Sequence, residues 1–233
     1  MQTGNRSLND MLAAQDAAVV LQARMSSNRV PGKMLREADG KPLVEHVLDR
    51  FRFDGPMDRV WIAPSDDPSD DPLAARSRPI GAKVYRGSLH GVGLARQEGF
   101  MSLIRVSADS PFLDVGVVRD VLALFDGEVD LATNVGKRTF PKGQSVEVIR
   151  VSKLAELHPE MTPEDREHVT TFFYRPPGRL RLVDLESGGD HGDFRMVVDT
   201  EDDWVRFSHA VETLGSRAVQ MNWRQIMSCL HGP

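Results

Sequence analysis

Three basic residues lie close together in a short polar loop near the start of the chain. The segment Leu21–Lys33 reads LQARMSSNRVPGK, in which small polar residues and a Pro-Gly turn separate Arg24, Arg29 and Lys33. Arginine binds phosphate oxygens two at a time through its planar guanidinium, and lysine adds a compact positive charge. Backbone N–H groups of a tight turn can add to such a site. The loop therefore predicts a site for a triphosphate, although a solvated basic loop would have the same composition.

Two aspartates each follow an apolar run that is expected to form a strand. Asp109 follows Leu103–Val106, and Asp199 follows Met196–Val198. Protein carboxylates hold Mg²⁺ in phosphoryl-transfer sites, where the ion keeps positions open for phosphate oxygens. Asp109 and Asp199 therefore predict a Mg²⁺ site, in which the ion would neutralise charge on the α-phosphate. The alternative is that either aspartate is only a helix N-cap.

A further set of polar residues is a candidate for binding a second substrate. Arg166, Glu167 and His168 lie in a segment with a helix start signal at Pro163, and Glu147 lies in a strand between two valines. Arg166 and His168 would suit an acidic substrate, and Glu147 would accept hydrogen bonds from hydroxyl groups. A solvated helix face is the alternative for the charged triplet, and an exposed sheet edge is the alternative for Glu147.

The elements that must position these residues alternate between strands and helices. Short apolar runs predict strands at Ala17–Gln22, Asp58–Ala63, Lys83–Arg86, Ser102–Ser107, Val129–Thr133, Ser145–Ile149, Arg179–Leu185 and Phe194–Asp199. Helical spacing predicts helices from Pro42 to Phe51, Val115 to Phe125, Pro163 to Phe173, Asp202 to Leu214 and Trp223 to Leu230. This order indicates an α/β, Rossmann-like fold: a mostly parallel sheet with helices on both faces, whose ligands gather at the carboxyl ends of the strands.

Composition narrows the function classes. The chain has 233 residues and a net charge of −5, which argues against a broad nucleic-acid-binding face. The sequence has no apolar run of about 20 residues and no apolar secretory core near its start, so we expect no membrane insertion and a cytoplasmic location. The single cysteine, Cys229, fits a reducing compartment. Residues 17–233 are expected to form one domain after a flexible extension over residues 1–16.

The polar loop resembles the signature of the cytidylyltransferases that activate acidic sugars, the group of the CMP-sialate and CMP-Kdo synthetases. The resemblance is greatest to the spore-coat polysaccharide biosynthesis branch of that group. It continues in order through Gly40–Leu48, Tyr85–Ser88, Ser107–Pro111, Arg138–Pro141, Val146–Val148, Arg166–Thr170 and Val198–Asp202. It spans nearly all residues from Ala17 to about Phe207.

The resemblance implies a nucleotidyltransferase of the nucleotide-diphospho-sugar transferase fold that uses CTP, Mg²⁺ and a sugar or sugar-acid acceptor, with homodimers common in the family. Catalytic roles would fall to Arg24, Lys33 and Asp109, and the metal would bind Asp109 and Asp199. The nucleotide would be bound by Leu21, Ala23, Arg24, Met25, Arg29, Lys33 and Ser88. The acceptor would be bound by Arg138, Glu147, Arg166, Glu167 and His168.

One segment departs from the family pattern. Gly91 stands where an aspartate is expected at the start of a helix beside the nucleotide, and Gly93 lowers the helix propensity of the same segment. Two alternatives therefore stay open: an enzyme that uses another triphosphate, and a catalytically weak nucleotide- or sugar-nucleotide-binding protein. A dehydrogenase is disfavoured because no Gly-x-Gly-x-x-Gly turn follows the first strand.

Overall fold

The computed structural model describes residues 6–87, 91–162, 169–174 and 180–230, with no account of the side chains of residues 169–171. Its helices are α1 Leu8–Ala14, α2 Leu43–Asp54, α3 Asp71–Ser77, α4 Val92–Glu98, α5 Val115–Ala123, α6 Val151–Leu157, α8 Val169–Tyr174, α9 Glu201–Leu214 and α10 Trp223–Leu230. Its strands are β1 Ala17–Gln22, β2 Glu37–Ala38, β3 Lys41–Pro42, β4 Val60–Ala63, β5 Lys83–Val84, β6 Ser102–Ser107, β7 Leu131–Thr133, β8 Glu147–Arg150 and β9 Leu182–Asp184. Short 3₁₀ turns are η1 Lys33–Leu35, η2 Pro68–Asp70, η3 His158–Glu160 and η4 Gly215–Gln220.

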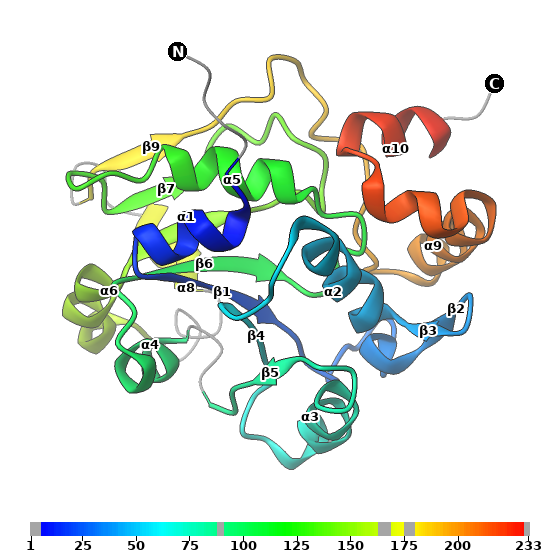
Figure 1. Ribbon diagram of the computed structural model, residues 1–233, viewed down its shortest axis with the longest axis horizontal. Coiled ribbons are helices and arrows are strands. Elements are labelled where there is room, and N and C mark those ends of the chain that lie inside the picture. The colour runs from blue at the N-terminus through cyan, green and yellow to red at the C-terminus, as the bar shows by residue number, and fades with distance from the viewer. Residues whose placement is uncertain (1–5, 88–90, 163–168, 175–179, 231–233) are drawn as a thin grey trace.

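The described strands form a seven-stranded sheet in the order β5-β4-β1-β6-β8-β7-β9, beside a small β2-β3 pair (Figure 1). Within the large sheet, β8 runs antiparallel to its neighbours β6 and β7, and the other pairings are parallel. The expectation of a mostly parallel sheet is confirmed. Because β8 is reversed, its first residue, Glu147, pairs with Arg105 near the carboxyl end of β6. Loops after β1 and β6 and the start of β8 therefore meet at one edge.

Helices cover both faces of the sheet because alternate residues of each strand point to opposite sides. Val19 and Leu21 of β1 join the large core formed with α1, α2, α5, α9 and α10, whereas Ala18 and Val20 pack against α4. Beyond α4, helix α6 packs its Leu154 against β7 and β8 on that second face (Figure 1). β1 is therefore buried on both sides, which explains its continuous apolar sequence.

The chain before β1 differs from the expected flexible extension. Residues 8–14 form helix α1, whose N-terminus is capped by Ser7, since its hydroxyl oxygen accepts a hydrogen bond from Asp10 N at 3.2 Å. Leu8 and Leu12 are buried in the main core, and Asp54 accepts a hydrogen bond from Leu8 N at 2.9 Å. Two leucines at i and i+4 among polar residues suffice to bury one side of a short helix.

The expected strand Phe194–Asp199 is also wrong. Instead of a strand, the segment has a bend at Val197 and forms an isolated bridge between Arg195 and Lys142. Lys142 N donates to Phe194 O at 2.8 Å, and Met196 N donates to Lys142 O at 2.7 Å. Met196 and Val198 are buried, so the apolar pattern reflects core contact without a continuous strand ladder.

Strands β1 and β6 and helix α10 have the predicted bounds, and the other predicted elements among the described residues are present with shifted ends. The predicted helix Pro163–Phe173 is described only from Val169, because residues 163–168 lie outside the described part, and Arg179–Leu185 yields the shorter edge strand β9.

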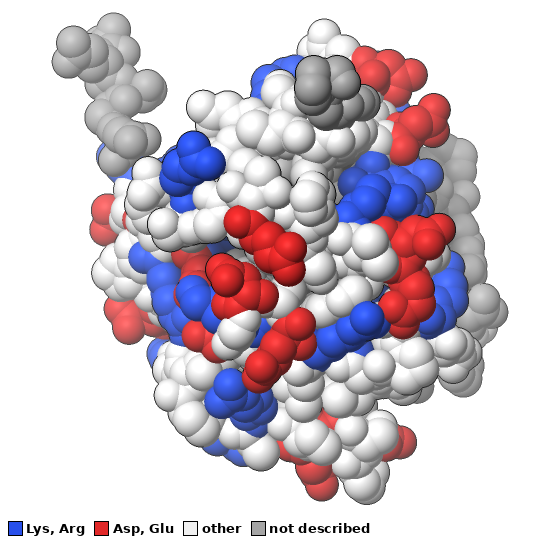
Figure 2. Space-filling view, turned by 90° about the vertical axis from the view of Figure 1, so that its right-hand side faces the viewer, with Lys and Arg blue, Asp and Glu red and all other residues white. Residues whose placement is uncertain are grey.

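None of the described helices is both long and apolar enough to cross a membrane. On the face seen in Figure 2, acidic and basic side chains lie interspersed.

We expect Leu12→Ala to lower the free energy of unfolding by about 2–5 kcal/mol, because it deletes a fully buried side chain that joins α1 to the core. Urea denaturation measures this change. Leu182→Ala is the matched control, since Leu182 is 39% exposed and its truncation should cost less than about 1 kcal/mol. Equal effects of the two substitutions would contradict the packing of α1.

Candidate active site

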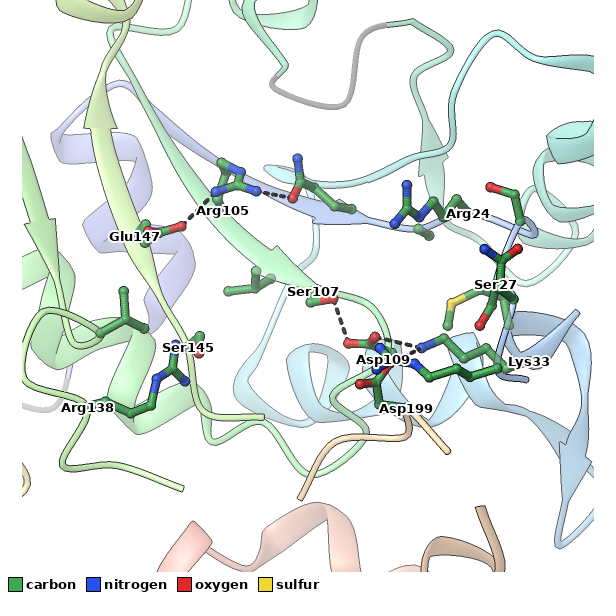
Figure 3. A pocket seen from close by; sticks show the side chains of 18 residues that line it. Arg24, Ser27, Lys33, Arg105, Ser107, Asp109, Arg138, Ser145, Glu147 and Asp199 are labelled. Atoms are coloured by element: carbon green, nitrogen blue, oxygen red, sulfur yellow. Dashed lines mark hydrogen bonds and ion pairs between the residues drawn. The ribbon is translucent and has the colours of Figure 1, made fainter. Parts of the chain in front are cut away.

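A cavity of about 660 Å³ lies at the sheet edge where the loops after β1 and β6 meet the start of β8. Figure 3 shows Lys33, Asp109 and Asp199 grouped in one part of it, and Arg105 with Glu147 in another. Its charged lining consists of five basic side chains and three carboxylates: Arg24, Arg29, Lys33, Arg105, Arg138, Asp109, Glu147 and Asp199. The cavity is thus positive in a chain whose net charge is −5, which favours an anionic ligand.

A buried carboxylate, that of Asp70, fixes the backbone of the loop between β1 and η1 through hydrogen bonds. Asp70, which is 1% exposed, accepts hydrogen bonds from Met25 N at 2.6 Å and from Ser65 N at 2.8 Å. Val30 is fully buried, and Gly32 adopts a left-handed conformation with φ of 69° immediately before Lys33. The loop therefore has a fixed course on which Arg24 and Arg29 remain exposed to the cavity.

Lys33 connects the two predicted metal-binding aspartates. Its Nζ lies 2.7 Å from Asp109 Oδ2 and 3.9 Å from Asp199 Oδ1, and it donates to Val198 O at 2.7 Å. Ser107 Oγ donates to the other oxygen of Asp109 at 2.6 Å, and Arg29 forms an ion pair with Asp199. Segments 90 residues apart in sequence thus bring their carboxylates around one ammonium group.

The donor set suits a hard divalent cation. Two carboxylates converge at the cavity, and the described residues contain no group of three or more His, Cys, Asp or Glu arranged to hold a metal ion. Mg²⁺ is commonly bound by one or two carboxylates together with substrate phosphates, whereas an all-protein cage would need more ligands. Asp109 and Asp199 therefore fit a metal shared with a phosphorylated substrate.

Asp203 holds the Asp199 segment in place. It is 3% exposed, accepts hydrogen bonds from Arg195 Nη2 at 2.6 Å and Asp199 N at 3.1 Å, and forms a capping box with Thr200 at the start of α9. Arg206 forms a further ion pair with it. Burial alone would raise the pKa of the Asp203 carboxyl, but the hydrogen bonds from Arg195 and from the Asp199 backbone hold that pKa well below its usual range.

Glu147, a predicted acceptor-binding residue, belongs to a second charged network whose other members the sequence did not single out. Arg105 Nη1 donates to Glu147 Oε2 at 2.7 Å, and Arg105 also forms a hydrogen bond with Gln22. Tyr174 at the end of α8 donates to Glu147 Oε1 at 3.0 Å, and its oxygen lies 2.9 Å from Thr133 Oγ1. Burial, and then the nearby charge of Glu147, raise the pKa of Tyr174. Tyr174 therefore stays protonated and donates a hydrogen bond that orients the Glu147 carboxylate.

Arg138 also faces the cavity, from the loop between β7 and β8. Its φ of 41° is unusual for a residue with a side chain, and Gly192 allows the close approach of the neighbouring chain, since a Cβ there would lie 2.4 Å from Arg138 O. His191 N donates to Thr139 O at 2.9 Å, which ties the same two segments together. Strained backbone held by such contacts is frequent at binding sites.

The remaining predicted site residues divide into three groups. Besides the charged residues above, Ala23 lines the cavity. Leu21 is fully buried in the core and Met25 packs against it from the loop, so neither side chain lines the cavity. Outside the described residues lie Ser88, Arg166, Glu167 and His168.

Backbone conformation and close packing explain why glycine occupies positions 91 and 93, where the sequence departs from the family pattern. Gly91 has φ of 69°, and a Cβ there would lie 3.1 Å from Leu103 Cδ1 and 3.3 Å from Val20 Cγ2. A Cβ at Gly93 would lie 1.9 Å from the hydroxyl oxygen of Tyr85. An aspartate at position 91 would therefore need a left-handed backbone and small shifts of the Leu103 and Val20 side chains.

Comparison with known sequences assigns the family. The sequence model of the family described as Cytidylyltransferase matches residues 18–200, a span that contains the basic loop and both aspartates. The chain belongs to the cytidylyltransferase family. The predicted enzyme class, a nucleotidyltransferase, and the predicted family are therefore confirmed.

Individual relatives of this cytidylyltransferase agree with that assignment. The spore coat polysaccharide biosynthesis protein SpsF of Bacillus subtilis is 30% identical over 218 residues, which are 87% of this chain and 89% of the relative. The 3-deoxy-manno-octulosonate cytidylyltransferase of Aeromonas hydrophila is 34% identical over 188 residues, or 74% and 70% of the two chains. A solved cytidylyltransferase structure from Leptospira borgpetersenii has a TM-score of 0.86 and 21% identity, covers 93% and 94% of the two chains, and supports the fold.

We expect Asp203→Asn to destabilise the cytidylyltransferase by about 2–4 kcal/mol at pH 7, because it removes a buried charge that satisfies Arg195 and two backbone N–H groups. A carboxyl whose pKa is depressed by folding contributes stability above its unfolded pKa of about 4 and loses it as the pH falls below that value. The difference between wild type and variant in urea unfolding should therefore shrink below about pH 4.

Asp202→Asn is the matched control for this prediction, since Asp202 is the exposed neighbour on the same helix. This substitution should change the free energy of unfolding by no more than about 0.5 kcal/mol, both at pH 7 and below about pH 4. A difference for Asp203→Asn that persists undiminished in acid would contradict the assignment of its effect to the charge.

Proposed function

We propose that this cytidylyltransferase transfers CMP from CTP to a hydroxyl group of a sugar acid, with Mg²⁺ held by Asp109 and Asp199 and pyrophosphate as the second product. The convergence of the basic loop and both aspartates on one cavity supports this proposal most strongly. The chemistry of a triphosphate requires positive charge and a divalent cation at the same place, because both neutralise phosphate oxygens.

The basic loop Leu21–Lys33, the phosphate loop, would bind the triphosphate. Arg24 and Arg29 are exposed at the cavity and would each bind two phosphate oxygens, whereas Lys33 would place one charge deeper in the site. The buried anchor at Asp70 keeps the backbone of this loop in place before the ligand arrives. Such preorganisation lowers the cost of ordering charged groups around the substrate.

In the reaction, the acceptor hydroxyl oxygen forms a bond to the α-phosphorus of CTP. The bond from that phosphorus to the bridging oxygen breaks, its electron pair leaves with pyrophosphate, and the hydroxyl proton passes to solvent. A bound Mg²⁺ would neutralise charge on the phosphate oxygens during this exchange. Arg24, Arg29 and Lys33 would hold the triphosphate so that the leaving group lies opposite the acceptor.

The part of the cavity away from the aspartates would bind the acceptor. Arg105 and Glu147 are held rigidly by each other and by Tyr174, and the nearby guanidinium of Arg138 would bind a carboxylate. The name of the Aeromonas relative, which acts on 3-deoxy-manno-octulosonate, supports a sugar acid. Neutralisation of Arg105 by Glu147 leaves Arg138 as the cation better suited to an acidic group.

We expect Asp109→Asn to lower pyrophosphate release from CTP by at least about 100-fold, because it removes a charged metal ligand that acts on the reacting phosphate. A coupled pyrophosphate assay with 3-deoxy-manno-octulosonate and related sugar acids as acceptors measures this. Asp66→Asn, at an exposed position outside the cavity, is the control that should retain turnover.

Undiminished turnover of Asp109→Asn would refute the metal assignment. CTP binding by wild type without pyrophosphate release for any sugar acid would favour a nucleotide-binding protein instead, the alternative left open by Gly91 and Gly93 in the sequence.

A further inference from the structure

The ammonium of Lys33 uses the same carboxylate oxygens that the proposed Mg²⁺ would need. Lys33 is 6% exposed, and its Nζ lies 2.7 Å from Asp109 Oδ2 and 3.9 Å from Asp199 Oδ1. The geometry is that of an internal cation placed between two carboxylates, which donates hydrogen bonds to Asp109 Oδ2 and Val198 O, each at 2.7 Å.

The other carboxylate oxygens also have partners. Ser107 Oγ donates to Asp109 Oδ1 at 2.6 Å, Arg29 forms an ion pair with Asp199, and Arg195 Nη2 lies 4.0 Å from Asp199 Oδ2. A divalent cation entering this arrangement would meet the positive charges of Lys33 and Arg29 at the two carboxylates. Like charges repel each other strongly where water is largely excluded, as at Lys33, which is 6% exposed, and less strongly at Arg29, whose side chain is 65% exposed.

We propose that Lys33 and the divalent cation compete for Asp109 and Asp199, so that the triphosphate must draw Lys33 away before the metal binds tightly. This inference rests on the proposed function, because it takes the two aspartates as the metal ligands. Lys33 belongs to the phosphate loop, and its four-carbon side chain carries a mobile point charge. Phosphate oxygens in the cavity offer that charge new partners, as they do for Arg29.

The coupling has a functional consequence. Without nucleotide, Lys33 and Arg29 keep the two carboxylates compensated, so the site binds free divalent ions weakly. With nucleotide, the two cations move to the phosphates, and the carboxylates become available at the place where the reacting phosphate lies. By linkage, the metal also strengthens nucleotide binding by the same factor.

Titration of the nucleotide-free, full-length protein with Mn²⁺ tests the competition, with free Mn²⁺ followed by electron paramagnetic resonance. We expect Lys33→Met and Lys33→Gln to bind Mn²⁺ at least about tenfold more tightly than wild type, because a competing charge is lost. Adding Asp109→Asn to Lys33→Met should abolish that gain. Arg36→Met removes a cation that pairs with Glu201 outside the cavity, so it should match wild type.

Circular dichroism checks that the variants are folded. Should both Lys33 variants unfold, Arg29→Met is the alternative, since Arg29 has a side chain that is 65% exposed and should give a smaller gain of about threefold. Equal or weaker Mn²⁺ binding in the folded variants, together with wild-type binding that requires Asp109, would overturn the competition and leave the proposed function intact. Mn²⁺ binding that is independent of Asp109 in every variant would overturn the metal assignment and the competition together.

Discussion

One backbone hydrogen bond, from Val198 N to Asp109 O at 2.8 Å, joins the two segments on which the proposed chemistry depends. Lys33 completes the link by donating to Val198 O and pairing with the Asp109 carboxylate. Neither segment continues a shared sheet ladder at this point, so the aspartates meet because the chain before α9 contacts the loop that follows β6. Contacts from Asp203 then hold Asp199 in that position.

The site also depends on local compensation of charge. A chain with a net charge of −5 concentrates positive charge in one cavity, yet Lys33 and Arg105 in that cavity each have a carboxylate partner. A phosphorylated ligand entering it exchanges existing ion pairs for new ones, because few of the charges are simply solvated. Ion pairs that can be exchanged in this way provide selectivity for ligands that offer several oxygens at once.

Sequence patterns predicted the elements that are buried on both faces with good accuracy. β1 and β6 have the expected bounds, because continuous apolar runs between polar loops have few alternative structures. The pattern failed where burial came without regular structure, at Phe194–Asp199, and where a mostly polar segment carried only two core residues, in α1.

The site was predictable to the extent that its residues share a local motif. Arg24, Arg29 and Lys33 lie within ten residues, so their common role could be inferred, and the cavity does collect them. Asp70, Arg105 and Tyr174 were missed because their partners are distant in sequence: Asp70 contacts Met25, Arg105 contacts Glu147, and Tyr174 contacts Glu147. An arginine inside a strand has no local signal that distinguishes a buried ion pair from an exposed edge residue.

The most direct test of the central claim, that this cavity is a metal-assisted CTP site, is thermal unfolding with each of the four ribonucleoside triphosphates, with and without Mg²⁺. A ligand that binds only the folded state at about 100 times its Kd stabilises it by about 2.7 kcal/mol. We expect a rise in Tm that is largest for CTP and is increased by Mg²⁺. No rise with any triphosphate, or an equal rise for all four that is independent of Mg²⁺, would contradict it.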